Sequence, residues 1–142
     1  MRKTSRILLL VGTILAFVCA GAFLITSIVN MVFMILTASG TFDQAFIDGS
    51  IKVNGQVDAE AAKAVILATT ITLFVVFLVV AILELLAAIF ALRARKVHNR
   101  KAYIIAIVFT VIGEAYVALA GSIVGLIAFN KESNRAAKQE SK

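Results

Sequence analysis

Two carboxylates, Glu84 and Glu114, are the residues of this 142-residue chain best placed to do chemistry, because each lies inside a long apolar run. A charged carboxylate in hydrocarbon costs several kcal/mol, so each is expected to be neutral, paired or turned toward protein. Two interpretations follow. The acids form a proton or cation relay, or they are protonated carboxyls that hydrogen-bond a neighbouring helix. Few other polar residues accompany them, which favours the structural interpretation.

The remaining polar candidates point away from catalysis. Asn30, the one amide of the first apolar run, is expected to bond another helix. His98 is the single histidine and cannot form a zinc site alone. Gly113, Gly121 and Gly125 lie in an apolar stretch and are expected to be packing residues, not a phosphate loop. The sequence therefore predicts a non-enzymatic protein without catalytic residues, metal ligands or a cofactor.

Three apolar runs must position these residues. Hydrophobic residues make up 61% of the chain and charged residues 15%, which is too few charges for an average soluble domain. Each run has at least 28 residues, against roughly 20 needed to cross a ~30 Å hydrocarbon core. The sequence predicts an all-α integral membrane protein, a single domain over 1–142. Its fold is a bundle of three long transmembrane helices at about 7–38, 59–96 and 102–130.

The third apolar run leaves an alternative open. A single span would place the polar tail 131–142, which is basic, on the outer side, against the tendency of basic residues to stay in the cytosol. Two half-helices meeting at Gly113-Glu114 would return the tail, giving four helices in all. Each half would have only about 14 residues, or ~20 Å, which is short for a span. We favour one span and keep the hairpin as the alternative.

The segment between the first two runs is expected to be an extracytoplasmic loop, at about 39–58. Asn54-Gly55 lies between residues that can pair as strands, which predicts a small β-hairpin. Asp58, followed by Glu60 and alanines, is typical of a helix start with a capping residue and an acid in the first turn. The second helix is therefore expected to begin next to Asp58.

Basic residues give the orientation. The net charge is +6, and most Lys and Arg flank the apolar runs: Arg2, Lys3 and Arg6, five residues in the turn 93–101, and four in the tail. This placement suits lipid headgroups and insertion bias, so the expected partner is the lipid bilayer and not nucleic acid. The N-terminus and the 93–101 turn are expected in the cytosol of a multi-pass plasma-membrane protein. The first run is too long for a signal peptide and is expected to remain as an uncleaved span.

Small residues share the helix faces of both acids. Helical spacing places Ala81, Ala88 and Ala91 beside Glu84. In a continuous third helix, Glu114 would share a face with Thr110, Ala118, Gly121 and Gly125. Gly121 and Gly125 form a small-xxx-small pattern that allows close approach of helices. These residues are the expected helix-packing positions.

The order of parts resembles small, uncharacterised multi-helix membrane proteins of Gram-positive bacteria that carry a domain of unknown function. The resemblance covers nearly the whole chain. It rests on the start 2–8, the alanine-rich approach 58–64, the basic turn 93–101 and the ending 121–131. It implies a Gram-positive plasma membrane, a frequently divided third apolar region and no known activity.

Three functions are compatible with these features. The leading hypothesis is an accessory or scaffold protein that packs with itself, as a homo-oligomer, or with a larger membrane-protein partner. The second is a transporter or channel subunit that uses Glu84 and Glu114. The third is a membrane sensor or immunity factor.

Overall fold

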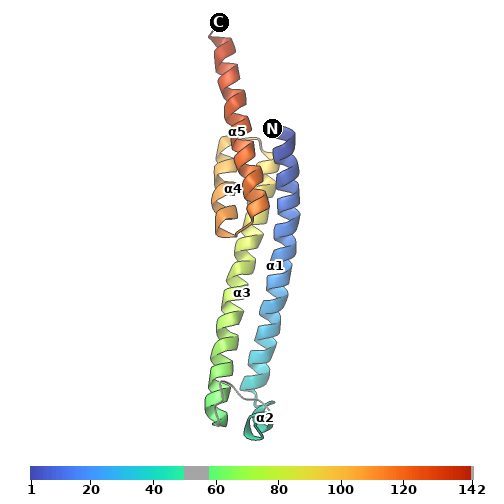
Figure 1. Cartoon of the computed structure of the whole chain (residues 1–142), viewed down its shortest axis with the longest axis vertical. Coiled ribbons are helices and arrows are strands. Elements are labelled where there is room, and N and C mark those ends of the chain that lie inside the picture. Colours follow the sequence, from blue (N-terminus) through green and yellow to red (C-terminus); the bar gives the residue numbers. More distant parts are fainter. Residues whose placement is uncertain (50–57, 142) are drawn as a thin grey trace. The chain divides into compact units, whose positions relative to one another are not determined.

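The computed structural model describes residues 1–49 and 58–141, and those residues form helices and no strand. Figure 1 shows five helices along the chain: α1 (Arg2–Ala38), α2 (Asp43–Ile47), α3 (Ala59–Lys96), α4 (Arg100–Ile112) and α5 (Tyr116–Glu140). The all-α fold class is therefore confirmed. Helices α1 and α3, of 37 and 38 residues, are long and apolar enough to cross a bilayer.

Helix α3 begins where the sequence places its start. The side chain of Asp58 accepts a hydrogen bond from the backbone N–H of Glu60 at 3.1 Å, which satisfies one of the free donors of the first turn. Helix α1 ends at Ala38 as expected but begins at Arg2, earlier than residue 7. The short helix α2 within the 39–58 loop was not expected, and the β-hairpin expected around Asn54-Gly55 lies outside the described residues.

The third apolar run is not one helix, so the favoured prediction of a single helix at 102–130 is wrong. Helix α4 has 13 residues and ends at Ile112, and α5 starts again at Tyr116. The two helices pack on each other as the hairpin of the alternative reading (Figure 1). Asn99 caps the start of α4, since its side chain accepts from the Lys101 N–H at 3.0 Å.

The turn between α4 and α5 is a left-handed helix cap. Glu114 has φ +56°, and its N–H bonds the Val111 carbonyl at 3.3 Å. The N–H of Ala115 reaches the Thr110 carbonyl at 2.9 Å. These two bonds close the end of α4 and reverse the chain. Glycine is the usual residue at the left-handed position of such a cap. Here glutamate occupies it, so the sequence carried no strong signal for a turn at this point.

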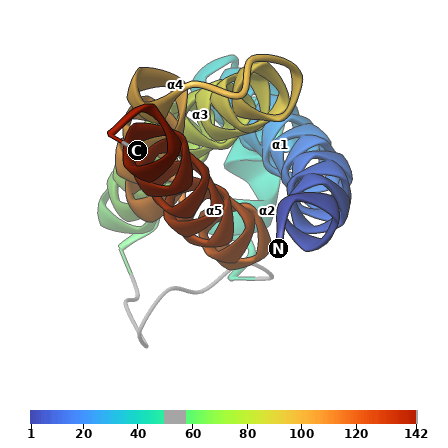
Figure 2. The ribbon, with the colours of Figure 1, turned by 90° about the horizontal axis from the view of Figure 1, so that it is seen from above.

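The chain divides into two compact units. The first, called here the hairpin unit, comprises Met1–Gly21 and Val80–Lys142. It contains the start of α1, the end of α3 and the α4–α5 hairpin, which Figure 2 shows from above. The second, called here the two-helix unit, comprises Ala22–Val79. It contains the later part of α1, α2 and the first part of α3.

The hairpin unit has a core of mostly small side chains. Its buried cluster consists of Leu9, Ala91, Ala94, Tyr103, Ala106 and Ala118. Helices α1 and α5 approach so closely that a Cβ added at Gly121 would lie 2.8 Å from the Leu9 nitrogen. Ser5 reinforces this crossing by donating from Oγ to the Gly121 carbonyl at 2.8 Å. Backbone-to-backbone packing of this kind requires glycine and alanine at the contact.

The two-helix unit is held by larger side chains and single hydrogen bonds. Phe23 and Phe77 stack with ring centroids 6.0 Å apart. Ser27 donates from Oγ to the Phe74 carbonyl at 3.1 Å, which links α1 to α3. Lys63 of α3 pairs with Asp43 of α2 at 2.6 Å, and this ion pair lies near the surface.

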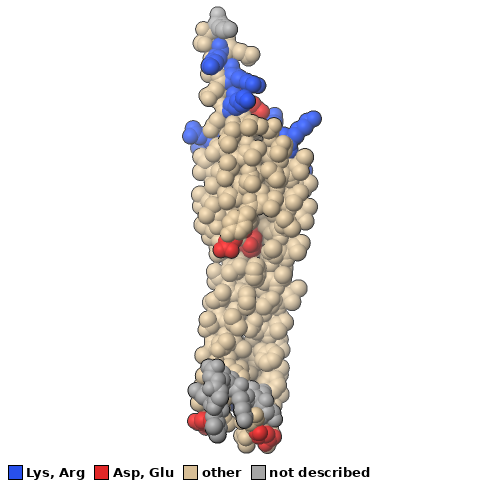
Figure 3. Space-filling view, viewed as in Figure 1, with Lys and Arg blue, Asp and Glu red and all other residues tan. Residues whose placement is uncertain are grey.

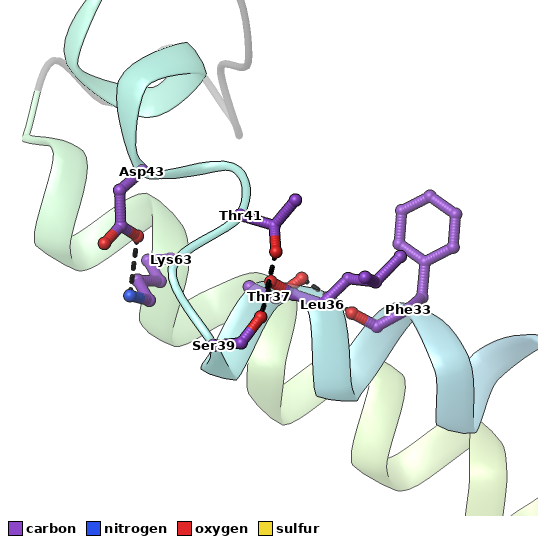
Figure 4. A network of polar contacts seen from close by, with 7 residues as sticks. All are labelled: Phe33, Leu36, Thr37, Ser39, Thr41, Asp43 and Lys63. Carbon is purple, nitrogen blue, oxygen red and sulfur yellow. Dashed lines mark hydrogen bonds and ion pairs between the residues drawn. The ribbon is translucent and has the colours of Figure 1, made fainter.

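Polar side chains close the end of α1, as Figure 4 shows. Thr37 donates to the Phe33 carbonyl at 2.8 Å, and Ser39 donates to the Leu36 carbonyl at 3.0 Å. The Ser39 and Thr41 hydroxyls lie 2.9 Å apart. These hydroxyls add to the backbone bonds that the Ser39, Gly40 and Thr41 N–H groups make to carbonyls at the helix end.

Candidate functional site

Glu84 lies on α3 within the hairpin unit, and its side chain faces protein. The residue is 7% exposed. Its Oε2 is buried without a hydrogen-bond partner, the one such side-chain atom among residues 1–49 and 58–141. Buried polar atoms in proteins are nearly always hydrogen-bonded, so an exception calls for a reason. The sequence-based expectation of a carboxyl that bonds a neighbouring helix finds no such bond at this atom.

The turn of the α4–α5 hairpin packs against the part of α3 that carries Glu84. Gly113 is buried there, and a Cβ on it would lie 3.1 Å from the Ala87 Cβ and 3.1 Å from the Leu83 carbonyl oxygen. These two neighbours flank Glu84 along α3. A side chain at Gly113 would therefore make this contact tight, and glycine leaves it unstrained.

Glu114 follows in the same turn but has a different environment. It is exposed, and its backbone is in the left-handed region at φ +56°. A non-glycine residue there costs roughly 1–2 kcal/mol, and strain of this kind clusters at functional sites. Because the helix is interrupted, Glu114 does not share a continuous helix face with Thr110, Ala118, Gly121 and Gly125, and that expectation is wrong.

The distance of Glu84 from the basic end of α3 follows from the helix rise. Glu84 precedes Arg93 by nine residues of the same helix. At 1.5 Å per residue this is about 14 Å, close to half the thickness of a ~30 Å hydrocarbon core. Figure 3 shows basic side chains at one end of the hairpin unit and acidic side chains at the turn end of the hairpin.

The expected packing residues lie at helix contacts of the hairpin unit. Ala81, Ala88, Ala91 and Ala118 are buried, each exposed by 5% or less. Gly121 faces α1, and a Cβ at Gly125 would collide with Ser5 and with the Tyr103 ring. The helix faces that carry small residues thus pack against other helices of the same chain.

Asn30 belongs to the two-helix unit, whereas both carboxylates belong to the hairpin unit. Its Nδ2 donates to the Thr26 carbonyl at 2.9 Å, one turn earlier in α1. The expected bond to another helix is therefore replaced by a bond within its own helix, and Asn30 is not part of the Glu84 site.

A polar cluster that the sequence did not reveal lies at the basic end of the hairpin unit. The two ring nitrogens of His98 lie 2.8 Å from the Tyr103 hydroxyl and 3.1 Å from Glu132 Oε2. The ring also packs edge-on against Phe129, with centroids 5.4 Å apart. His98 thereby ties the α3–α4 turn to α5. Glu132 comes near His98 only because the chain folds back as the α4–α5 hairpin, so the spacing of the two residues in the sequence did not predict the contact.

Neither a metal cluster nor a known relative explains these residues. Within the described ranges no group of three or more His, Cys, Asp or Glu side chains could hold a metal ion. Comparison with protein-family models, curated proteins and solved structures finds no match to this chain.

Proposed function

We propose that this chain is a non-enzymatic integral membrane protein of the plasma membrane, with α1 and α3 crossing the bilayer. It acts as an accessory or scaffold protein that packs with itself or with a larger membrane partner. Large apolar side chains stay exposed along both helices, including Ile14, Val18, Ile25, Val75 and Ile82 at 49–64%. Contiguous exposure of this kind suits lipid or a partner helix.

In this proposal the α4–α5 hairpin enters the bilayer from the basic side and turns back inside it. Its 13-residue α4 is only about 20 Å long, less than the ~30 Å core. A turn at that depth needs its backbone satisfied and shielded by protein, and the buried Gly113 with the bonds of the turn supplies both. This arrangement keeps the N-terminus, the 93–101 turn and the tail on the cytosolic side, in agreement with their charge.

The observation that carries the scaffold role over a conduit is how the hydroxyl side chains are used. Thr13, Thr70, Thr110 and Ser122 are buried and donate to carbonyls of their own helices at 2.6–2.9 Å. A pathway for ions or polar solutes needs polar groups that line it and remain free to exchange partners. These hydroxyls are engaged in local bonds, which supports a packing role.

Cysteine accessibility tests this topology. The single cysteine of the sequence, Cys19, is first replaced by alanine. In that background we expect Gln44→Cys to react with a membrane-impermeant thiol reagent on intact cells. Lys96→Cys and Ser141→Cys should react only after the membrane is opened. Labelling of Ser141→Cys on intact cells, with protection of Lys96→Cys, would show that the third run crosses and would refute the hairpin topology.

A second candidate function rests on Glu84 alone. Its unpartnered Oε2, on the stretch of α3 that the hairpin turn contacts, is a place where a proton or a small cation would find a ligand. Under this candidate the protein is a transporter or channel subunit. Ion or proton flux in proteoliposomes that is lost in Glu84→Gln would support it, and the absence of flux in the wild-type chain would remove it.

A further inference from the structure

A cavity of about 230 Å³ lies in the hairpin unit between the end of α3 and the start of α4. Its apolar lining residues, called here the apolar wall, are Phe90, Val97, Ala102 and Ile105. Phe90 is held in place by stacking on Phe109 of α4, with ring centroids 4.3 Å apart. Ile105 is 42% exposed, so this wall opens to the surroundings of the unit.

Two basic side chains, called here the rim cations, also line this cavity. Arg93 from α3 and Lys101 from α4 line it, together with Asn99. In the described part of the chain, the ion pairs are Lys63–Asp43 and His98–Glu132, so neither rim cation pairs with a carboxylate. The Asn99 side chain already accepts from the Lys101 N–H, which fixes the start of α4 beside the rim. Two cations without a carboxylate partner thus line a cavity whose other lining residues, apart from Asn99, are apolar.

We propose that this cavity binds one anionic phospholipid. Its phosphate lies between Arg93 and Lys101, and the first carbons of an acyl chain lie against Phe90 and Ile105. The inference rests on the proposed membrane location, because only there does the last turn of α3 lie at headgroup depth. Basic pockets between helices on the cytosolic side recognise anionic headgroups by this combination of charge and apolar wall. Arginine suits the phosphate because its guanidinium offers several donors in one plane.

The arrangement selects a lipid over a free phosphate ion. An inorganic phosphate would use the rim alone and would leave the apolar wall without a partner. Because they line the cavity, the rim cations can be distinguished by mutation from other basic residues nearby. Lys96 lies in the same basic turn and is exposed, yet it does not line the cavity. It therefore provides a control with an identical change of charge.

The test is the apparent melting temperature of the full chain in a neutral detergent. Phosphatidylglycerol should raise it by about 3 °C or more, by preferential binding to the folded state. Phosphatidylcholine with the same acyl chains, and inorganic phosphate, should leave it nearly unchanged. Arg93→Gln and Lys101→Gln should each remove most of the shift, and Lys96→Gln should keep it. Ile105→Ser, at an exposed position, should reduce the shift without changing the melting temperature of the lipid-free protein.

Several results would overturn the inference. Equal shifts with the two lipids would show that no anionic headgroup is selected. An equal shift with inorganic phosphate, or a full shift in Ile105→Ser, would remove the role of the acyl chain. Loss of the shift in Lys96→Gln would assign it to diffuse charge. Alkaline carbonate extraction of cell membranes tests the proposed function separately. Release of the chain refutes the membrane location, whereas retention without lipid selectivity refutes this site alone.

Discussion

The hairpin unit and the two-helix unit join helices by different means. In the hairpin unit the contacts run through Gly12, Gly121 and Gly125, where backbones or ring atoms occupy the space of a missing side chain. In the two-helix unit an aromatic stack and the Ser27–Phe74 hydrogen bond join the long helices. Close backbone contact leaves no room for change, whereas contacts between large flexible side chains can adjust. We therefore expect the two units to differ sharply in their tolerance of substitution.

The largest expected effect is at Gly125. In Gly125→Leu the new side chain would collide with Tyr103 and Ser5, so we expect a loss of about 3 kcal/mol or more. Gly21→Leu is the matched control, because no atom lies within 4 Å of a Cβ at that position. It should change stability by less than about 0.5 kcal/mol. Thermal unfolding in detergent measures both, and similar midpoints for the two variants would show that the hairpin contact is absent.

Glu84→Leu comes next in size and should stabilise the hairpin unit. An unpartnered buried polar atom costs roughly 1–3 kcal/mol, and leucine of similar bulk removes it. Glu84→Gln keeps a buried polar group and should gain little. A destabilised Glu84→Leu would reveal a bond that holds the bundle. A stabilised variant that shows the phenotype of a deletion would identify the carboxyl as functional, since stability is commonly given up at such positions.

Glu114→Gly should raise stability by about 1 kcal/mol, because glycine adopts positive φ without strain. Glu114→Ala removes the same charge but keeps a Cβ, so it should show no comparable gain. The difference in melting temperature between these two variants measures the cost of holding a residue with a Cβ at positive φ. If alanine stabilises as much as glycine, the cost lies in the carboxylate and not in the left-handed turn.

The smallest effects compare one hydrogen bond in each unit. Ser5→Ala should cost about 1 kcal/mol, because its buried hydroxyl bonds Gly121 at a contact that cannot repack. Ser27→Ala should cost about 0.5 kcal/mol, because the partly buried bond is longer and its surroundings are more adaptable. Unfolding midpoints of the two variants and of the wild-type chain provide the measurement. Equal losses would argue that tolerance does not differ between the units.

Much of the fold was accessible from the sequence because local signals marked it. Asp58 with Glu60 gave the start of α3, and apolar length gave α1 and α3. The break at Gly113-Glu114-Ala115 was misjudged for a physical reason. The apolar pattern continues through it, and the turn places a glutamate where glycine is usual. Gly113 also packs on Leu83 and Ala87 of α3, a tertiary contact without a local signal in the sequence.

The candidate site was predictable only in part. Composition alone singles out Glu84 and Glu114 as acids among apolar residues. Helical spacing then gave the face of Glu84 correctly, because α3 is continuous, and gave the face of Glu114 wrongly, because α4 ends first. The His98–Glu132 pair and the Arg93–Lys101 cavity depend on how the hairpin folds back, and spacing along the chain does not encode either of them.

The broken third run also has a consequence for biosynthesis. If the protein is inserted into the membrane as proposed, residues 102–129 form a stretch long enough for the insertion machinery to accept as a single span when they leave the ribosome. In the folded protein the hairpin packs on α3 through Gly113 and on α1 through Leu8, Leu9 and Gly12, which receive α5. A chain lacking α1 should therefore insert this stretch straight across and deliver its carboxyl terminus to the opposite compartment. Packing of α5 on α1, as much as hydropathy, would then decide the final topology.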